Sequence, residues 1–375
     1  MQSDARRRLR ALIVKEIFQI IRDPSSILIS VVLPLIMLII YGFGVSLDLD
    51  HLRIGLVLED TSPDAISFAK SLTDSRYFEV SIVRDRREME RAIMSGTVRG
   101  FIVVPSYFSQ FRLRPDQVAP IQVIADGSEP NTANFVQIYA QSAWQNWLQQ
   151  EQISSDLQGL SLVQLQPRYW FNEELESRNS LVPGSIAVIL TLVGTLLTSL
   201  VVAREWERGT MEALIATPVT VRELFLGKFI SYFVLGMLSF VFSYFFAVWV
   251  YDVPARGSFL AFLITAAVFL LPALGLGLYV STTSRSQIIS TQFALILGFM
   301  PSFMLSGFVF EISSMPFWIQ CFTYVIPARY FVTSLQTLFL VGDVMRLLLI
   351  NLVPMLILGV LLCVATIKKT VKRLD

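Results

Sequence analysis

The chain is poor in the residues from which catalytic and metal sites are built. Its 375 residues include one histidine, His51, and two cysteines, Cys321 and Cys363. A metal site needs several such ligands close together, and a disulfide framework needs more cysteines, so we expect neither. The two thiols are interpreted as apolar packing groups. Without a histidine beside a serine or cysteine, we do not expect a hydrolase triad either.

Nucleotide-binding signals are missing as well. There is no phosphate-binding loop of the form G-x-x-x-x-G-K-[S/T], because Gly227-Lys228 is followed by Phe229. The formal net charge of +1 gives no bulk electrostatic reason to bind nucleic acid. We therefore expect the chain to be no enzyme, to hold no cofactor or metal of its own, and to have no nucleic-acid partner.

Charged residues are absent from the centres of six long apolar stretches, although 54% of the chain is hydrophobic. A stretch of about 20 residues crosses about 30 Å of hydrocarbon as a helix. A helix also satisfies its own backbone hydrogen bonds in lipid. The sequence thus predicts an α-helical polytopic membrane protein with six transmembrane helices, at 26–47, 181–202, 229–249, 258–281, 287–310 and 347–367.

Positive charge is distributed unequally between the short loops. Fifteen Lys and Arg residues fall in the N-terminal segment, the alternate loops and the C-terminal tail that would share one side, against three in the short outer segments. Because Lys and Arg accumulate on the cytoplasmic side, both termini are expected there, as in a multi-pass protein of the bacterial inner membrane. The first span has no cleavage site and is interpreted as a retained signal anchor.

The N-terminal segment 1–25 has its own pattern. Residues 8–22 alternate apolar and charged positions at helical spacing, and Asp23-Pro24 would end the helix. Such a helix is expected to lie on the inner membrane surface, with its arginines toward anionic lipid headgroups. The alternative is a simple anchor with no moving part.

The long outer segment 48–180 is expected to be an inserted extracytoplasmic domain. Strand patterns and helix patterns alternate along it, which is typical of an α/β layer structure. The expected strands are 53–58, 78–83, 100–105 and 120–125, and the expected helices are 63–74, 85–95 and 131–157.

A second outer segment, 306–345, is too apolar for a solvated loop and too interrupted by proline for one span. We expect a pair of short re-entrant helices, because irregular backbone at that depth is tolerated when it is covered by protein.

The inner segment 204–218 is the most informative polar loop. Four charged residues surround a tryptophan in its first five positions. Glu205 and Arg208 form an i,i+3 pair that would support a helix, which Gly209 would end or bend. After a second helical turn, Thr217-Pro218 would restart the chain.

The next helix is expected to begin at Thr220, with Glu223 completing a capping box. Composition leaves two interpretations of 204–218 open. It is either a charged connector required by membrane topology, or a short rigid helix that docks onto a soluble partner and receives its motion.

A family resemblance decides between them. The run from Arg204 to Glu212, followed by Thr217-Pro218-Val219, resembles the coupling-helix signature of permeases of the type-2 ABC exporter family. The segments 305–310, Met315-Pro316 and 327–330 resemble the outer re-entrant segment of the same family. The outer domain is similar to that of its bacterial multidrug-exporter-like branch. The resemblance covers essentially the whole chain, and Glu311 departs from it.

This resemblance implies a type-2 ABC exporter fold and separate ATP-binding-cassette ATPase subunits, which would use ATP and Mg²⁺. It also implies a second permease in a homodimer or a paralogous heterodimer, contact with membrane lipids, and in some relatives a periplasmic adaptor protein. Trp206 and Met211 would anchor the ATPase, while Glu205, Arg208 and Glu212 would make charged contacts. The full set of expected ATPase-coupling residues is Arg204, Glu205, Trp206, Arg208, Gly209, Thr210, Met211, Glu212, Thr217 and Pro218.

The resemblance also places a transport path between the two protomers, where spans two and five would meet. Small residues would allow close packing there, although ordinary helix packing explains them equally: Gly184, Gly194, Ala294 and Gly298.

The uncharged spans predict an apolar or amphipathic cargo, such as a drug-like molecule or a lipid, because a charged cargo would find no partners. Two other classes stay open from the residues alone. An ion-coupled secondary transporter usually carries acids or histidines inside its spans. A membrane-anchored ligand sensor needs fewer spans than six and a larger inner domain.

Overall fold

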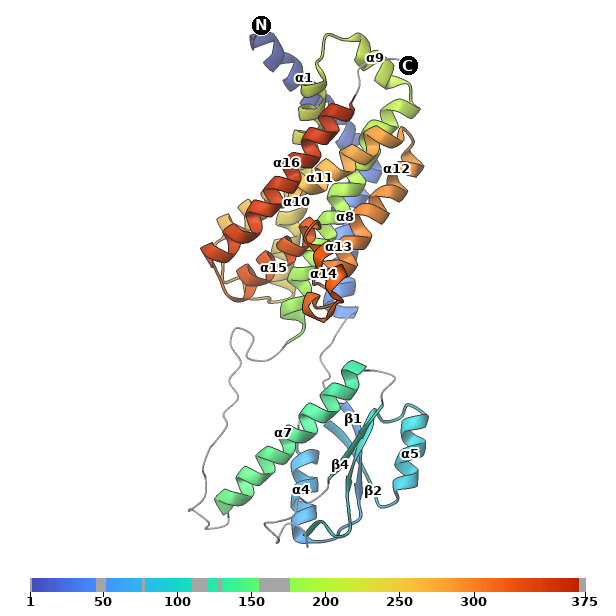
Figure 1. Cartoon of the computed structure of the whole chain (residues 1–375), viewed down its shortest axis with the longest axis vertical. Coiled ribbons are helices and arrows are strands. Elements are labelled where there is room, and N and C mark those ends of the chain that lie inside the picture. The colour runs from blue at the N-terminus through green and yellow to red at the C-terminus, as the bar shows by residue number, and fades with distance from the viewer. Residues whose placement is uncertain are drawn as a thin grey trace. The chain divides into compact units, whose positions relative to one another are not determined.

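The computed structural model describes residues 2–44, 52–75, 78–109, 121–126, 130–154 and 176–370. The chain divides into two compact units. The first, the membrane unit, comprises Met1–Ser46 and Arg168–Asp375; the second, the α/β unit, comprises Leu47–Pro167 (Figure 1). Each unit has its own hydrophobic core.

Six helical segments of the membrane unit are long and apolar enough to span a membrane, which confirms the predicted polytopic helical fold. Several extend beyond the apolar stretches, because their charged ends continue the same helix. In chain order the segments are Pro24–Gly44 (α2, η1, α3 and η2), Arg178–Glu207 (α8), Val221–Val250 (α10), Phe259–Ser284 (α11), Gln287–Leu305 (α12, η3 and α13) and Met345–Lys369 (α16).

Two of the spans contain π-helical turns beside a proline. The turn Leu28–Val32 (η1) precedes Pro34, and the turn Leu295–Phe299 (η3) precedes Pro301. Proline has no N–H, and its ring clashes with the carbonyl four residues earlier in an α-helix. A wider turn at that position relieves the clash while the helix continues.

The second span, α8, is the central helix of the membrane unit. Of its most apolar window, 89% is buried, whereas the other spans bury between 17% and 50%. It packs against α3, α10, α11, α12 and α15 of the same chain (Figure 1).

The small residues of the second and fifth spans serve this packing inside one chain. A Cβ built on Gly194 would lie 3.0 Å from the Cβ of Ala273, and one built on Gly298 would lie 2.8 Å from Cγ2 of Thr195. Gly184 faces the ring of Phe308 in the same way, and Ala294 is buried. Within the described chain, Gly298 of the fifth span meets Thr195 of the second, whereas Gly194 meets Ala273 of the fourth span. The expected contact of spans two and five between protomers stays a prediction.

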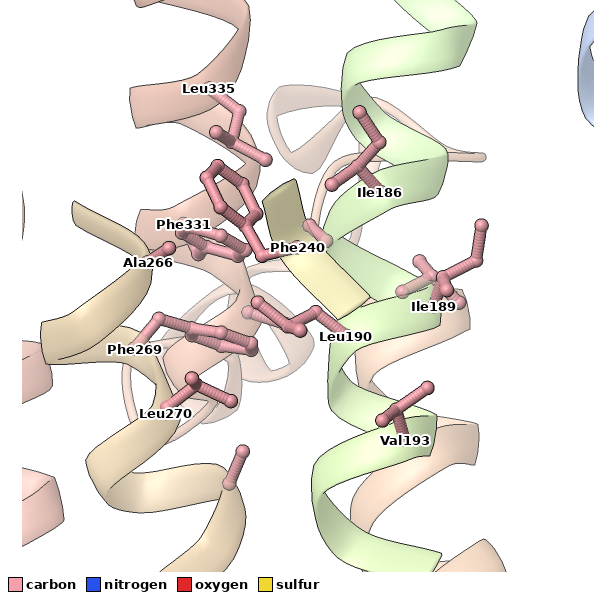
Figure 2. Packing of buried hydrophobic residues seen from close by; sticks show 14 of the residues in the cluster. Ile186, Ile189, Leu190, Val193, Phe240, Ala266, Phe269, Leu270, Phe331 and Leu335 are labelled. Carbon is pink, nitrogen blue, oxygen red and sulfur yellow. The ribbon is translucent and has the colours of Figure 1, made fainter. Parts of the chain in front are cut away.

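Aromatic side chains fill the space between α8, α11 and α15 (Pro327–Leu340). The rings of Phe269 and Phe331 stack with their centroids 4.0 Å apart and their planes at 7°. Figure 2 shows these rings on the sides of α11 and α15 that face Leu190 of α8. Offset stacking adds to the energy of burial, so this pair is a main contact of the membrane core.

The segment 306–345 contains two short helices, α14 (Phe317–Thr323) and α15, after a single 3-10 turn at Ile312–Ser314. Its α15 is largely buried, whereas Trp318 of α14 is 82% exposed. The guanidinium of Arg329 lies 3.9 Å from the ring centroid of Tyr324 and also bonds Thr323, which fixes the turn between the two helices. Glu311, the residue that departs from the family pattern, is exposed and accepts a hydrogen bond from Ser313.

The α/β unit contains a four-stranded sheet in the order β2-β1-β3-β4. Strands β1, β2 and β3 are parallel, and β4 is antiparallel to β3. The alternation of strands and helices predicted from the sequence is confirmed here. The strands are β1 (Leu52–Leu58), β2 (Phe78–Val83), β3 (Gly100–Val104) and β4 (Gln122–Ala125).

Helices cover both faces of this sheet. Two helices, α4 (Pro63–Thr73) and α7 (Pro130–Ser154), share one core with the strands, where Phe68 and Trp147 meet edge to face. The third, α5 (Arg86–Met94), packs on the other core through Met89. The expected continuation of α7 to residue 157 lies outside the described residues.

Replacing Phe331 by alanine should lower the free energy of unfolding by about 3 kcal/mol, because it removes the stacked ring and leaves a cavity that rigid helices cannot close. Thermal denaturation of the purified chain in detergent measures this. Phe317→Ala is the matched control, since that ring is 68% exposed. Equal melting temperatures for the two variants would show that the α8–α11–α15 contact does not hold the unit together.

Candidate functional site

The loop between α8 and α10 forms a bent element that we call the elbow, residues 204–220. Helix α8 ends at Glu207, and Gly209 then adopts a left-handed backbone with φ of +68°. Only glycine adopts this conformation without strain, so Gly209 sets the bend. A seven-residue helix, α9 (Thr210–Ala216), follows.

The end of the elbow is held by the predicted capping box. The backbone N–H of Thr220 donates to Oε2 of Glu223 at 2.7 Å, and the N–H of Glu223 donates to Oγ1 of Thr220 at 3.3 Å. Both orphan donors at the start of α10 are thereby satisfied. This confirms the start of the third helix, and it gives α9 fixed supports at both ends.

The ten expected ATPase-coupling residues separate into two groups by exposure. Arg204, Glu205 and Met211 are buried, and Trp206 and Thr217 are half-buried. The exposed members are Arg208, Gly209, Thr210, Glu212 and Pro218.

Met211 and Glu205, both expected to contact a partner, are buried among residues of their own chain, and their coupling role stays a prediction. The side chain of Met211 is 2% exposed and lines a small crevice together with Val202, Phe225, Lys228, Leu278 and Thr366. Met211 therefore anchors α9 to the spans of its own chain.

A cluster of four charges lies beneath the elbow, and we call it the ion cluster: Lys15, Glu16, Glu205 and Lys228. Three of these side chains are buried, and that of Lys15 is 40% exposed. The Nζ of Lys228 lies 3.0 Å from Glu16 and 2.7 Å from Glu205, and the Nζ of Lys15 lies 2.9 Å from Glu16 and 2.5 Å from Glu205. The side chains of Lys228 and Glu16 are 2% and 1% exposed. Each carboxylate contacts both lysines, so the cluster is neutral and mutually compensated, as buried charges must be.

Two further ion pairs flank this cluster. The guanidinium of Arg204 lies 2.6 Å from Asp23, and that of Arg8 lies 2.8 Å from Glu223. Together with the ion cluster, these pairs join the N-terminal helix α1 (Gln2–Arg22), and Asp23 directly after it, to α8 and α10. Figure 1 shows α1 at the end of the helical bundle that also carries α9.

Sequence reasoning missed this arrangement of α1. It placed the helix on the inner membrane surface, which stays a prediction, and gave no sign that one face packs along α10, with Leu12 against Gly227. The opposite face keeps apolar side chains exposed, among them Ile17 and Phe18. One signal in the sequence could have indicated this packing. Glu16 is a single acid within the apolar stripe of α1, and a buried carboxylate needs a cation beside it.

The elbow is also tied to the loop between α11 and α12. The backbone N–H of Gln287, at the start of α12, donates to Oε1 of Glu207 at 2.7 Å. The guanidinium of Arg285 lies 4.6 Å from the ring centroid of Trp206, a cation–π distance. Displacement of the elbow would therefore reach the fifth span as well as the second and third.

Burial and neighbouring charges shift the pKa values of Lys15 and Glu16 in opposite directions. Burial raises the pKa of Glu16, but the nearby charges of Lys228 and Lys15 outweigh it and hold that pKa below its usual 4.5. Burial likewise lowers the pKa of Lys15, but Glu205 and Glu16 outweigh it and hold it above 10.5. Both groups therefore stay charged at neutral pH.

The elbow and the ion cluster combine an exposed surface with ionic contacts inside the chain. Among the described residues, no group of three His, Cys, Asp or Glu side chains comes together as a metal site. The elements present are an exposed bend, an anchoring methionine and an ionic link to three helices.

The chain belongs to the family of ABC-2 family transporter proteins, whose model matches residues 24–368. It is 47% identical over 369 residues, 98% of each chain, to the probable multidrug ABC transporter permease YbhS of Escherichia coli strain K12. It is 28% identical over 353 residues to the probable multidrug ABC transporter permease YbhR of the same strain, covering 94% of this chain and 95% of that one. ABC transporter G family member 20 of Dictyostelium discoideum is 21% identical over 343 residues, which cover 88% of this chain and 45% of that protein.

Replacing Lys228 by methionine should lower the free energy of unfolding by about 3–5 kcal/mol, because Glu16 and Glu205 would lose a buried cation. Thermal denaturation in detergent reports the change. Lys369→Met, at the exposed end of α16, is the control. Adding Glu16→Gln to Lys228→Met should restore part of the loss, and a further loss in the double variant would contradict the ion cluster.

The contribution of Glu16 to stability should depend on pH only in acid. Its pKa is lowered in the folded chain, so its stabilisation is complete above about pH 4.5 and is lost as pH falls through the folded value. The difference in melting temperature between the wild type and Glu16→Gln should thus be constant from about pH 6 to 9 and shrink below about pH 4. A difference that changes between pH 6 and 9 would contradict this assignment.

Proposed function

We propose that this chain is the membrane permease subunit of an ATP-driven ABC exporter, and that the exposed surface of its elbow docks onto an ATP-binding-cassette ATPase. The observation that carries the proposal is the combination of an exposed bend with a buried ionic anchor. The exposed residues Arg208 and Glu212 present opposite charges on this bend. Membership of the ABC-2 transporter family supports the same assignment.

The coupling residues would act in two ways. Arg208, Thr210, Glu212 and Pro218 would contact the ATPase, with Gly209 setting their orientation. Arg204, Glu205, Trp206 and Met211 would transmit the displacement through their contacts inside the chain. The hydroxyl of Thr217 donates to the carbonyl of Leu214 at 2.6 Å and closes the last turn of α9, so it would stiffen the docking helix.

The assembly would contain two permeases and two ATPase subunits, which bind the ATP and Mg²⁺. The second permease is either a copy of this chain or a paralogue. Both termini would lie in the cytoplasm, where the elbow can reach the ATPase. The exposed apolar face of α1 suits membrane lipids. The α/β unit would lie in the periplasm, and it is the part that a periplasmic adaptor would meet.

An apolar or amphipathic cargo fits the described spans, because their ionisable groups gather near the ends. Polar side chains do occur inside α8, but they are hydroxyls that mostly bond their own helix. Thr191 and Thr195, for example, donate to carbonyls four residues earlier. A highly charged cargo would find no compensating charge along such a route. The names of the YbhS and YbhR permeases, which carry the word multidrug, agree with this class of cargo.

Proteoliposomes that contain the permease and its ATPase should export a hydrophobic dye when ATP is supplied. Reversing both exposed elbow charges, Arg208→Glu with Glu212→Arg, should reduce export by about tenfold or more and weaken ATPase capture, without lowering the melting temperature. Arg87→Glu with Glu88→Arg, an exposed pair in the α/β unit, is the matched control.

Several results would count against the proposal. Normal export by the elbow variant would remove the docking site. Export driven by a proton or sodium gradient without ATP would favour a secondary transporter. Export of a polyanion with no effect on hydrophobic compounds would overturn the cargo class.

A further inference from the structure

One turn of α8, between Ser199 and Ala203, has an unusual set of hydrogen-bond partners. In an α-helix the N–H of residue 203 pairs with the carbonyl of residue 199. Here the N–H of Ala203 also donates to Oγ of Ser281 at 2.9 Å, and the N–H of Val202 donates to the same oxygen at 3.0 Å. The carbonyl of Ser199 also accepts from Oγ of Ser290 at 2.6 Å.

These two serines come from different spans. Ser281 belongs to α11 and Ser290 to α12, and both are fully buried. Both ends of one backbone hydrogen bond of α8 therefore have a second partner on a neighbouring helix. Other hydroxyls of these helices, such as those of Ser284 and Thr291, bond the carbonyl of their own helix four residues earlier.

Close contact between α8 and α11 brings Ser281 into position. A Cβ built on Gly277 would lie 2.0 Å from Oγ1 of Thr198, so only glycine lets the two backbones approach so closely there. Ser281 lies one helical turn further on the same face of α11. From there its hydroxyl reaches the backbone of α8.

A helix inside a membrane resists bending, because an opened backbone hydrogen bond has no water to replace its partner. Bends therefore occur where side chains supply substitutes. In α8 such side chains are present at both ends of one backbone hydrogen bond: Ser281 at the N–H of Ala203 and Ser290 at the carbonyl of Ser199. The turn lies directly before Arg204 and Glu205, where the elbow and the ion cluster begin.

We infer that the turn 199–203 is the hinge of α8, and that Ser281 and Ser290 are positioning residues that keep its backbone hydrogen-bonded while the elbow moves. This inference rests on the proposed function. The part of α8 after the hinge moves with the ATPase, and the part before it stays packed in the membrane core. The two hydroxyls thus connect motion of the elbow to the fourth and fifth spans.

The test measures cargo exported per ATP hydrolysed in the same proteoliposomes. Ser281→Ala and Ser290→Ala should each lower this ratio by about fivefold, the effect of one lost hydrogen bond, while ATP hydrolysis continues. Ser284→Ala and Thr291→Ala are the matched controls, and they should keep the wild-type ratio. Ser281→Cys preserves the side-chain volume but is a weak hydrogen-bonding group, so it should behave like Ser281→Ala.

The outcomes separate this inference from the proposed function. If the wild type exports and Ser281→Ala and Ser290→Ala match it, the hinge is wrong and the exporter assignment stands. A wild-type ratio for Ser281→Cys would show that only packing matters, and it would also overturn the hinge. If the wild type itself shows no ATP-driven export, the proposed function and the hinge fail together. Should Ser281→Ala not fold, the volume-preserving Ser281→Cys variant carries the test.

Discussion

The arrangement of the end of the membrane unit that carries the elbow depends on the need to compensate buried charge. Lys228, near the start of the third span, lies too deep to reach water, and Glu205 lies at the same depth on the second span. Neither would be tolerated alone in an apolar setting. Lys15 and Glu16 of the N-terminal helix complete the set, which fixes that helix against the bundle. A cluster with this geometry defines the relative positions of three helices more sharply than apolar packing can, because each carboxylate must meet both ammonium groups.

The same cluster explains why the elbow can be both exposed and firmly held. A short helix of seven residues has little stability by itself. Here α9 is fixed by Met211 in its crevice, by the glycine bend at one end and by the capped start of α10 at the other. The residues beneath it belong to a network that reaches α1, α10 and α12. The surface that a partner would touch and the residues that carry its displacement are therefore different sets.

Much of the fold could be predicted from the sequence, because its strongest signals are local. The absence of charge marks the six spans, and the alternation of strand and helix patterns marks the α/β unit. The capping box at Thr220 and the bend at Gly209 depend on neighbouring residues and were equally accessible. Several predicted spans nevertheless ended early, although the fifth, predicted to residue 310, ends at Leu305. An apolar window stops at the first charge, whereas α8 continues to Glu207 because Arg204 and Glu205 find partners elsewhere in the chain.

What the sequence could not show were contacts between distant residues. Glu16 and Lys228 are separated by 212 positions, and no periodicity links them. The orientation of the elbow side chains was inaccessible for the same reason, since burial of Met211 depends on α10, α11 and α16. The small residues of the second span were also ambiguous. Glycines in a membrane helix indicate a close neighbour but do not identify it, and here the neighbours were in the same chain.

The complete enclosure of α8 has a consequence for how such a subunit is made. A protomer whose innermost helix is already surrounded does not need a companion to finish its interior. Its interior is built by one polypeptide, which leaves its other surfaces available for joining further subunits. Gene duplication could then alter the joining surfaces of one copy without disturbing its folding, which opens a simple evolutionary route from identical to non-identical pairs.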